Sequence, residues 1–235
     1  LRGADIDTPI PPRADRDVPA PLSAVQERIW LFQQLEPGSA TYNLTPVLRL
    51  RGRLDVARLE RALHDVVQGH EPLRTHVVSG ATGPTTLVRP APRVALPVED
   101  VSDMAEPQRS AAVTEAIARS QREPFDLATQ FPWRAILVRH AVDVHDLVVT
   151  LHHIAADGTS IQILFRELFQ RYAGRPIATP PIGYSDFAEW QRRALEEGQR
   201  DRLVAEWKAY LEGAPTELAL PTDRPRPPLQ TFRGG

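Results

Sequence analysis

An apolar run that ends in two adjacent histidines constrains this chain more than any other feature. Leu147, Val148, Val149 and Leu151 form a nearly continuous hydrophobic stretch, which is typical of a core strand. Residues 152–158 read His-His-Ile-Ala-Ala-Asp-Gly, and a helical apolar pattern begins directly after them. The sequence therefore predicts a strand, a short loop and a helix, with polar side chains placed where the strand ends.

The two histidines are not equivalent at such a position. Successive side chains of a strand point to opposite faces, so only one of His152 and His153 can face a given cavity. A neutral imidazole can take a proton from an attacking amine or hydroxyl near neutral pH, so the pattern favours acyl transfer assisted by one histidine. A core histidine satisfied by backbone hydrogen bonds remains the structural alternative.

A metal centre is the less favoured interpretation of the same residues. Structural zinc sites usually have four protein ligands and catalytic sites three, drawn from His, Cys and carboxylate side chains. The chain has no cysteine, and adjacent histidines of a strand face opposite ways. We therefore expect no metal ion and no disulfide.

The charge pattern gives no sign of nucleic acid or membrane binding. The formal net charge of the 235 residues is −2, and acidic and basic residues are interspersed. Such a chain presents no basic face to nucleic acid or to anionic lipid. It has no apolar run long enough to cross a bilayer and no signal segment at its start, so we expect a cytoplasmic protein. The first residue is Leu1, as in a fragment of a longer chain.

Hydrophobic periodicity predicts a mixed succession of helices and strands, hence an α/β fold of the α+β type. Capping residues followed by apolar residues at helical spacing mark helices, and short apolar runs mark strands. The predicted helices span residues 23–35, 55–69, 107–119, 159–172, 184–193 and 200–211. The predicted strands span residues 44–50, 74–78, 85–88, 94–98, 133–138 and 146–151, the last two as an antiparallel pair.

The ends of the chain differ in kind from its middle. Residues 1–20 contain four prolines and no apolar periodicity, which is typical of an interdomain linker. Residues 21–180 hold most of the predicted elements and are expected to form one lobe. Residues 181–235 are expected to supply connecting helices, with Trp207 and Leu211 facing inward, and the truncated start of a second lobe.

Four motifs occur in an order and spacing that resemble a known family. Residues 21–30 (Pro-Leu-Ser-Ala-Val-Gln-Glu-Arg-Ile-Trp), 70–75 (His-Glu-Pro-Leu-Arg-Thr), 152–158 and 184–191 (Tyr-Ser-Asp-Phe-Ala-Glu-Trp-Gln) are similar to successive motifs of condensation domains of nonribosomal peptide synthetases. Each motif alone is weakly specific, whereas four in order are strongly so. The resemblance covers residues 21–235 and is to the N-terminal half of such a domain.

This resemblance implies a fold and a reaction. The fold would be a lobe like that of chloramphenicol acetyltransferase, with a mixed sheet flanked by helices and the start of a second similar lobe. The reaction would be amide bond formation in nonribosomal peptide synthesis, as in antibiotic biosynthesis. The amine of an acceptor aminoacyl thioester would attack a donor acyl or peptidyl thioester. Peptidyl carrier proteins would deliver both on phosphopantetheine arms, beside an adenylation domain and with no bound cofactor.

The resemblance also assigns roles to five residues. His153 matches the second histidine of the signature, which faces the reaction centre and either takes a proton or positions the amine. Gly158 would let its backbone approach the acyl group and face a developing oxyanion, although a simple turn glycine is equally open. His152, Asp157 and Arg74 would support the site: His152 inside the lobe, and Asp157 as ion-pair partner of Arg74, where loss of either partner would cost about 3–5 kcal/mol.

Two other functions remain open. The first is a noncatalytic module that docks carrier proteins or recruits tailoring enzymes. The second is a stand-alone acyltransferase of the same superfamily, which would use a coenzyme A thioester and a hydroxyl or amine acceptor. The second motif departs from the family at Gly69, where an arginine is usual, and Thr159 stands where a tryptophan is common.

Overall fold

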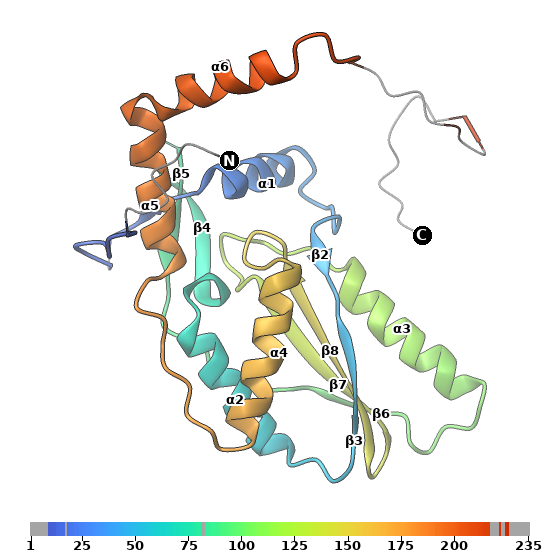
Figure 1. Ribbon diagram of the computed structural model, residues 1–235. Coiled ribbons are helices and arrows are strands. Elements are labelled where there is room, and N and C mark those ends of the chain that lie inside the picture. Colours follow the sequence, from blue (N-terminus) through green and yellow to red (C-terminus); the bar gives the residue numbers. More distant parts are fainter. Residues whose placement is uncertain (1–8, 17, 81–82, 217–220, 222–223, 226–235) are drawn as a thin grey trace.

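A mixed five-stranded sheet lies at the centre of the fold (Figure 1). Strand β8 (Val144–His152) pairs antiparallel with β2 (Asn43–Leu44), β3 (Val47–Arg51) and β7 (Trp133–Ala141). The short β6 (Val98–Asp100) completes the sheet by running parallel to β7. The predicted antiparallel pair of core strands is confirmed, and both strands extend beyond their predicted bounds.

The structure is a computed structural model that describes residues 9–16, 18–80, 83–216, 221 and 224–225. The remaining residues include parts of the predicted linker and most of the predicted start of a second lobe, which therefore lie outside the described residues. Within the described residues, no helix combines the length and the apolar composition needed to cross a membrane.

Helices cover both faces of the sheet. Helices α2 (Val56–Gly69) and α4 (Gly158–Tyr172) lie over one face, and α3 (Gln108–Arg122) lies over the other (Figure 1). The apolar residues of β8 alternate accordingly: Leu147, Val149 and Leu151 join the core with α2 and α4, while Val148 joins the core with α3. This alternation places His152 on the α3 side, two pleats beyond Val148.

A second, three-stranded antiparallel sheet stands beside the first. Its order is β1 (Ala20–Pro21), β5 (Gly83–Val88) and β4 (Thr75–Gly80), so the strands predicted at residues 74–78 and 85–88 are confirmed, and they form a hairpin. Helix α1 (Ala24–Leu35) follows β1, and the 3₁₀ turn η1 (Glu71–Arg74) precedes β4.

A separate hydrophobic core joins this part of the fold to the loop that carries the histidine signature. Its buried members come from β4, α1 and the residue before its cap, the segment after α3, and the signature loop: Leu22, Ile29, Val77, Phe125, Leu127 and Ile154. The signature loop is therefore packed between the two sheets at the end of β8.

The last two predicted helices are present, but the expected burial of the second one is wrong. Helix α5 (Tyr184–Ala194) continues through a π-helical turn, η2 (Leu195–Gln199), into α6 (Arg200–Tyr210). Figure 1 shows α6 projecting away from the central sheet. Because nothing in the described residues covers its outer side, Trp207 is 56% exposed and Leu211 is 53% exposed.

The described part of the proline-rich segment is held against α5. The backbone amide of Arg13 donates to Asp186 Oδ1 at 2.8 Å, and the Arg13 guanidinium donates to Glu189 at 2.7 Å. Arg16 donates to Asp186 Oδ2, also at 2.7 Å. The Arg13 side chain is 5% exposed and that of Asp186 is fully buried, so residues 9–16 belong to the folded body.

Candidate active site

The histidine signature turns the chain from the central strand into helix α4. His152 is the last residue of β8 and pairs with Asn43 of β2. The amide of Ala155 donates to the carbonyl of His152 at 2.9 Å, which closes a turn that contains His153. Asp157 then caps α4. The signature is thus held at one end by a core strand and at the other end by the cap of a helix.

His152 lies inside the protein, as strand alternation predicts. It is 1% exposed and packs between the rings of Tyr42 and Phe125, with ring centroids 6.1 and 6.0 Å away. Its Nδ1 accepts the backbone N–H of Ile154 at 3.2 Å, and its Nε2 lies 2.9 Å from Oε1 of Gln33. A backbone amide can only donate, so the ring proton is on Nε2. Burial, followed by the charge of His153, lowers the pKa of His152 to about 4. His152 is therefore neutral at physiological pH.

His153 has the opposite environment. It is exposed, and its backbone amide donates to the carbonyl of Tyr42 at 2.8 Å. The Tyr42 ring meets the imidazole edge-on, at a centroid distance of 6.2 Å. No hydrogen bond joins this imidazole to another residue among those that the structure describes. Its main chain is fixed and both ring nitrogens are available to a ligand.

Asp157 caps helix α4, and the predicted ion pair with Arg74 is wrong. Asp157 Oδ1 accepts the amide and the hydroxyl of Ser160 at 2.8 and 2.7 Å, and these bonds lower the pKa of Asp157. Arg74 instead donates to the carbonyl of Arg89 at 3.0 Å, and no ion pair joins it to Asp157 within the described residues. The carboxylate has turned toward the first turn of its own helix, where the unpaired amides offer local donors.

Gly158 is the first residue of helix α4, and the space beside it is open. A Cβ built on this residue would meet no atom within 4 Å, and the residue is exposed. Its backbone conformation lies outside the left-handed region that favours glycine. The fold itself therefore does not require glycine here, and the space above Gly158 can admit a substrate group.

Two glutamines of α1 contact the signature, and sequence reasoning missed one of them. Gln26, in the first motif, donates from Nε2 to the carbonyl of Ile154 at 3.1 Å. Gln33, which lies outside all four motifs, holds His152 and donates from Nε2 to the carbonyl of Phe125 at 2.8 Å. Both glutamines are buried, with 6% and 7% exposure. Their spacing of seven residues on the inward face of an amphipathic helix is the sequence signal that points to them.

The first, second and fourth motifs meet beside this loop. Ser23 Oγ lies 3.0 Å from the hydroxyl of Tyr184, and the hydroxyl of Ser185 donates to Glu71 at 2.8 Å. The Glu71 carboxylate lies so close to Gly183 that any Cβ there would collide with it. The motifs that are far apart in sequence therefore form one connected scaffold around the signature.

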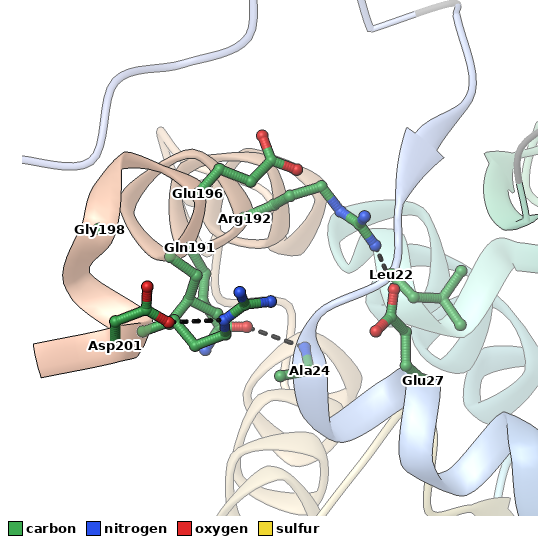
Figure 2. Close-up of a pocket in the computed structure, with 10 residues that line it drawn as sticks. Leu22, Ala24, Glu27, Gln191, Arg192, Glu196, Gly198 and Asp201 are labelled. Atoms are coloured by element: carbon green, nitrogen blue, oxygen red, sulfur yellow. Dashed lines mark hydrogen bonds and ion pairs between the residues drawn. The ribbon is translucent and has the colours of Figure 1, made fainter. Parts of the chain in front are cut away.

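One sizeable cavity lies away from the signature. It has a volume of about 500 Å³ and lies between the start of α1 and the junction of α5 with α6. Figure 2 shows Arg192 paired with Glu27 in it, and Gln191 reaching the amide of Ala24. None of residues 152–158 lines this cavity, so we do not place the chemistry there.

A smaller cavity of about 110 Å³ adjoins the signature loop. Its lining is mostly apolar and comes from η1 and the residue before it, the loop and α4: His70, Pro72, Leu73, Ala155, Ala156, Ser160, Ile163 and Leu164. His70 Nε2 also contacts Glu167 at 2.9 Å. Within the described residues, no group of three or more His, Cys, Asp or Glu side chains is arranged to hold a metal ion.

Comparison with known proteins gives consistent matches over most of the chain. A family model described as "Condensation domain" matches residues 18–235. The chain is 38% identical over 229 residues to malpibaldin synthetase of Mortierella alpina, a match that covers 95% of this chain and 4% of that protein. It is 36% identical to phosphinothricin tripeptide synthetase PhsC of Streptomyces viridochromogenes, a match covering 97% of this chain and 22% of that protein.

Solved structures agree with these matches. The X-domain from teicoplanin biosynthesis is 34% identical, with a TM-score of 0.78, and the match covers 92% of this chain and 48% of that one. The first condensation domain of the CDA synthetase is 25% identical, with a TM-score of 0.74, covering 87% of this chain and 53% of that one. The chain thus spans about half the length of these structures and a small part of the curated relatives.

Proposed function

Because the chain belongs to the condensation-domain family of nonribosomal peptide synthetases, we propose that it supplies the histidine-bearing lobe of a domain that forms amide bonds. The two substrates are a donor acyl or peptidyl thioester and an acceptor aminoacyl thioester. Peptidyl carrier proteins hold both on phosphopantetheine arms, in a cytoplasmic assembly that also contains an adenylation domain. We further propose that residues 21–180 form the first lobe and that residues 181–235 lead into the second.

One observation carries this proposal: the signature presents one histidine outward and buries the other. The exposed imidazole of His153 has a fixed main chain and no hydrogen-bond partner in the described part of the chain. The buried His152 is occupied by two hydrogen bonds within the protein. An imidazole held in this way is suited to an incoming amine.

The reaction needs one nucleophile and one leaving group. The lone pair of the acceptor amine attacks the donor carbonyl carbon, so a C–N bond forms and the C–S bond breaks. The nitrogen loses one proton, and the departing thiolate gains one to become the free thiol of the donor arm. His153 lies where it can accept the N–H hydrogen of the amine, either to take its proton or to hold it in line for attack.

We infer that the amide of Gly158 is the second group of the signature loop that acts on the substrate. It belongs to the first turn of α4, where backbone N–H groups lack helical partners. An oxyanion that develops on the donor carbonyl would be stabilised by such a donor. The free space above Gly158 supports this role.

A product assay tests the proposal directly. The full-length synthetase module, with both carriers loaded, is compared with its His153→Ala variant. We expect the variant to lose about 100-fold or more in the rate of amide formation, the size of effect that general base catalysis or positioning supplies.

His64→Ala is the matched control for this assay. His64 lies in α2, contacts the carbonyl of Pro92 and does not line the cavity beside the signature. This variant should therefore retain the wild-type rate. Equal turnover by the wild type and the His153→Ala variant would reject the enzymatic function.

A recruitment module is the second candidate, and one observation favours it. The X-domain is more similar in sequence to this chain than the CDA condensation domain, at 34% against 25% identity. Its structure is also known as a complex with OxyB. If this chain is a recruitment module, the wild-type module forms no amide product from loaded carriers, and His153→Ala leaves partner binding unchanged. Product formation from a coenzyme A thioester in place of a loaded carrier would instead identify an acyltransferase with a free substrate.

A further inference from the structure

Two glutamine side chains of helix α1 form hydrogen bonds with the signature turn. Gln26 and Gln33 are seven residues apart, so they lie two turns apart on the same face of the helix. Gln26 binds the carbonyl of Ile154, and Gln33 binds the ring of His152. The two amides therefore hold the residues on either side of His153.

The hydrogen bonds around Gln33 have only one consistent arrangement. The carbonyl of Phe125 can only accept, so the Gln33 amide nitrogen faces it and the amide oxygen faces His152. His152 must then donate from Nε2. Its Nδ1 must in turn be unprotonated, because it accepts the amide of Ile154. The chain of hydrogen bonds from Phe125 through Gln33 and His152 to Ile154 thus fixes the tautomer of the neutral His152 imidazole.

This tautomer controls the shape of the turn that carries His153. The bond from the Ile154 amide to Nδ1 of His152 spans His153, and the amide of His153 is bonded to Tyr42. If the proton moved to Nδ1, that atom and the Ile154 amide would be two donors facing each other. The turn would have to open, and the imidazole of His153 would move with it.

Packing alone does not explain an amide at position 33. An apolar side chain of similar size would fill the same space without the cost of burying a polar amide. A buried amide that is satisfied at both ends instead specifies one orientation of its neighbours. We propose that Gln33 is a positioning residue for His153, acting by holding His152 in the tautomer that closes the signature turn. This inference rests on the proposed function of His153.

The first test removes the hydrogen bonds and keeps the volume. Gln33→Met in the full-length module leaves the Nε2–H of His152 without an acceptor. We expect kcat for amide formation to fall about 10- to 100-fold with KM nearly unchanged, because small displacements of a reacting group have effects of this size. Gln34→Met is the matched control, since Gln34 is the next residue on α1 and is exposed. It retains wild-type kcat.

The second test uses a charge to distinguish positioning from simple stabilisation. Gln33→Glu keeps an acceptor for His152 but places a carboxylate beside the imidazole, which raises the pKa of His152. Hydrogen–deuterium exchange at the imidazole C2 position, followed by mass spectrometry, measures that pKa in a large protein. As His152 becomes doubly protonated, Nδ1 can no longer accept the Ile154 amide. We therefore expect kcat of Gln33→Glu to fall at a higher pH than that of the wild type or of Gln33→Met, and to recover as the pH is raised.

The outcomes separate this inference from the proposed function. Inactive His153→Ala together with a slow Gln33→Met and a pH-dependent Gln33→Glu supports both. Inactive His153→Ala with full kcat in Gln33→Met overturns the inference alone. The inference is also overturned by a second result. In that result the loss of kcat in Gln33→Met equals the unfolded fraction of the variant, and kcat of Gln33→Glu has the pH profile of the wild type. Full activity of His153→Ala rejects the proposed function, and the role of Gln33 in it.

Discussion

Asp157 and Ser160 form the cap of helix α4, in which one carboxylate oxygen accepts both the amide and the hydroxyl of Ser160, at 2.8 and 2.7 Å. The acid of the signature thus fixes the helix start that follows the histidines. Its side chain acts within four residues and is not bonded to Arg74. The consequence is a stabilising role that is local and modest in size.

Asp157→Ala therefore lowers the free energy of unfolding by about 1 kcal/mol, as expected for loss of an N-cap at an exposed position. A buried ion pair would have given about 3–5 kcal/mol. Asp157→Ser retains a capping oxygen and should lie within about 0.5 kcal/mol of the wild type. Urea denaturation of the three proteins measures these differences. A loss above about 3 kcal/mol for Asp157→Ala would mean that a buried cation depends on this carboxylate.

The buried His152 makes stability depend on pH. Its pKa is about 4 in the folded protein and near 6.5 in the unfolded chain. The unfolded chain therefore binds more protons between these values, and stability falls as the pH drops from 6.5 toward 4. The contribution is complete above pH 6.5 and amounts to about 3 kcal/mol over the whole window.

His152→Gln isolates this contribution from other titrating groups. The variant is less stable at pH 7, but its stability lacks the His152 proton linkage. The stability advantage of the wild type should therefore shrink by about 2 kcal/mol between pH 7 and pH 5. Urea denaturation at pH 7, 6 and 5 measures the difference. Parallel pH profiles for the two proteins would show that His152 is protonated, or solvated, in the folded state.

Asp186 ties the N-terminal segment to α5 and should protect it. Its fully buried carboxylate accepts the amides of Arg13 and Gly183 and the guanidinium of Arg16. Asp186→Ala removes the acceptor of the two amides, while Arg16 keeps its contacts with Pro181 and Glu71, and should lower the free energy of unfolding by about 3 kcal/mol. Trypsin cleaves after arginine, so cleavage at Arg13 should accelerate about tenfold or more as the segment opens locally.

Asp201→Ala is the control for this experiment. Asp201 also pairs with an arginine, but its side chain is 82% exposed, and exposed pairs contribute little to stability. Its stability and its rate of cleavage at Arg13 should match the wild type. If Asp186→Ala resists trypsin as the wild type does, the segment is held by contacts other than this carboxylate.

Local sequence patterns were sufficient for most of the elements and for the position of the signature, although the strand predicted at residues 94–98 is wrong, since β6 begins only at Val98. Three features depend only on neighbouring residues: the apolar runs of β7 and β8, the Ser23 cap of α1, and the glycine-bounded hairpin of β4 and β5. Burial of His152 follows from its place at the end of a strand whose central residues are apolar and which is covered on both faces. These features were predictable because the interactions that create them lie within a few residues of one another.

The interactions that were missed join residues far apart in the chain. Arg13 and Asp186 are 173 positions apart, and Gln33 and His152 are 119 apart. Pairings of this kind depend on the tertiary fold, so no local pattern specifies them. The error about Asp157 has the opposite cause. The motif resemblance implies a distant cation, Arg74, as its partner, whereas the carboxylate is satisfied locally by the cap of its own helix. The exposure of Trp207 on α6 likewise depends on what packs against the helix.

Gly158→Ala distinguishes a glycine needed by the fold from one needed by the substrate. The added Cβ would meet no protein atom within 4 Å, and the backbone there is compatible with alanine. Alanine is also the better helix former, so stability should be unchanged or raised by up to about 1 kcal/mol. If a donor acyl group passes over this residue, the methyl group occupies its path. We expect kcat/KM for amide formation to fall about tenfold or more, an effect of steric misplacement.

Gly38→Ala is a closely matched control. Gly38 also has no atom within 4 Å of a built Cβ and no left-handed backbone, but it lies in the turn after α1, outside the signature loop. It should keep both stability and kcat/KM. Full activity of Gly158→Ala would make Gly158 a simple turn glycine and would mean that the acyl group does not pass over this residue. A large loss of stability would instead mean that the open space beside it is filled by another part of the protein. The two measurements together assign this glycine to the chemistry only when activity falls and the unfolding midpoint does not.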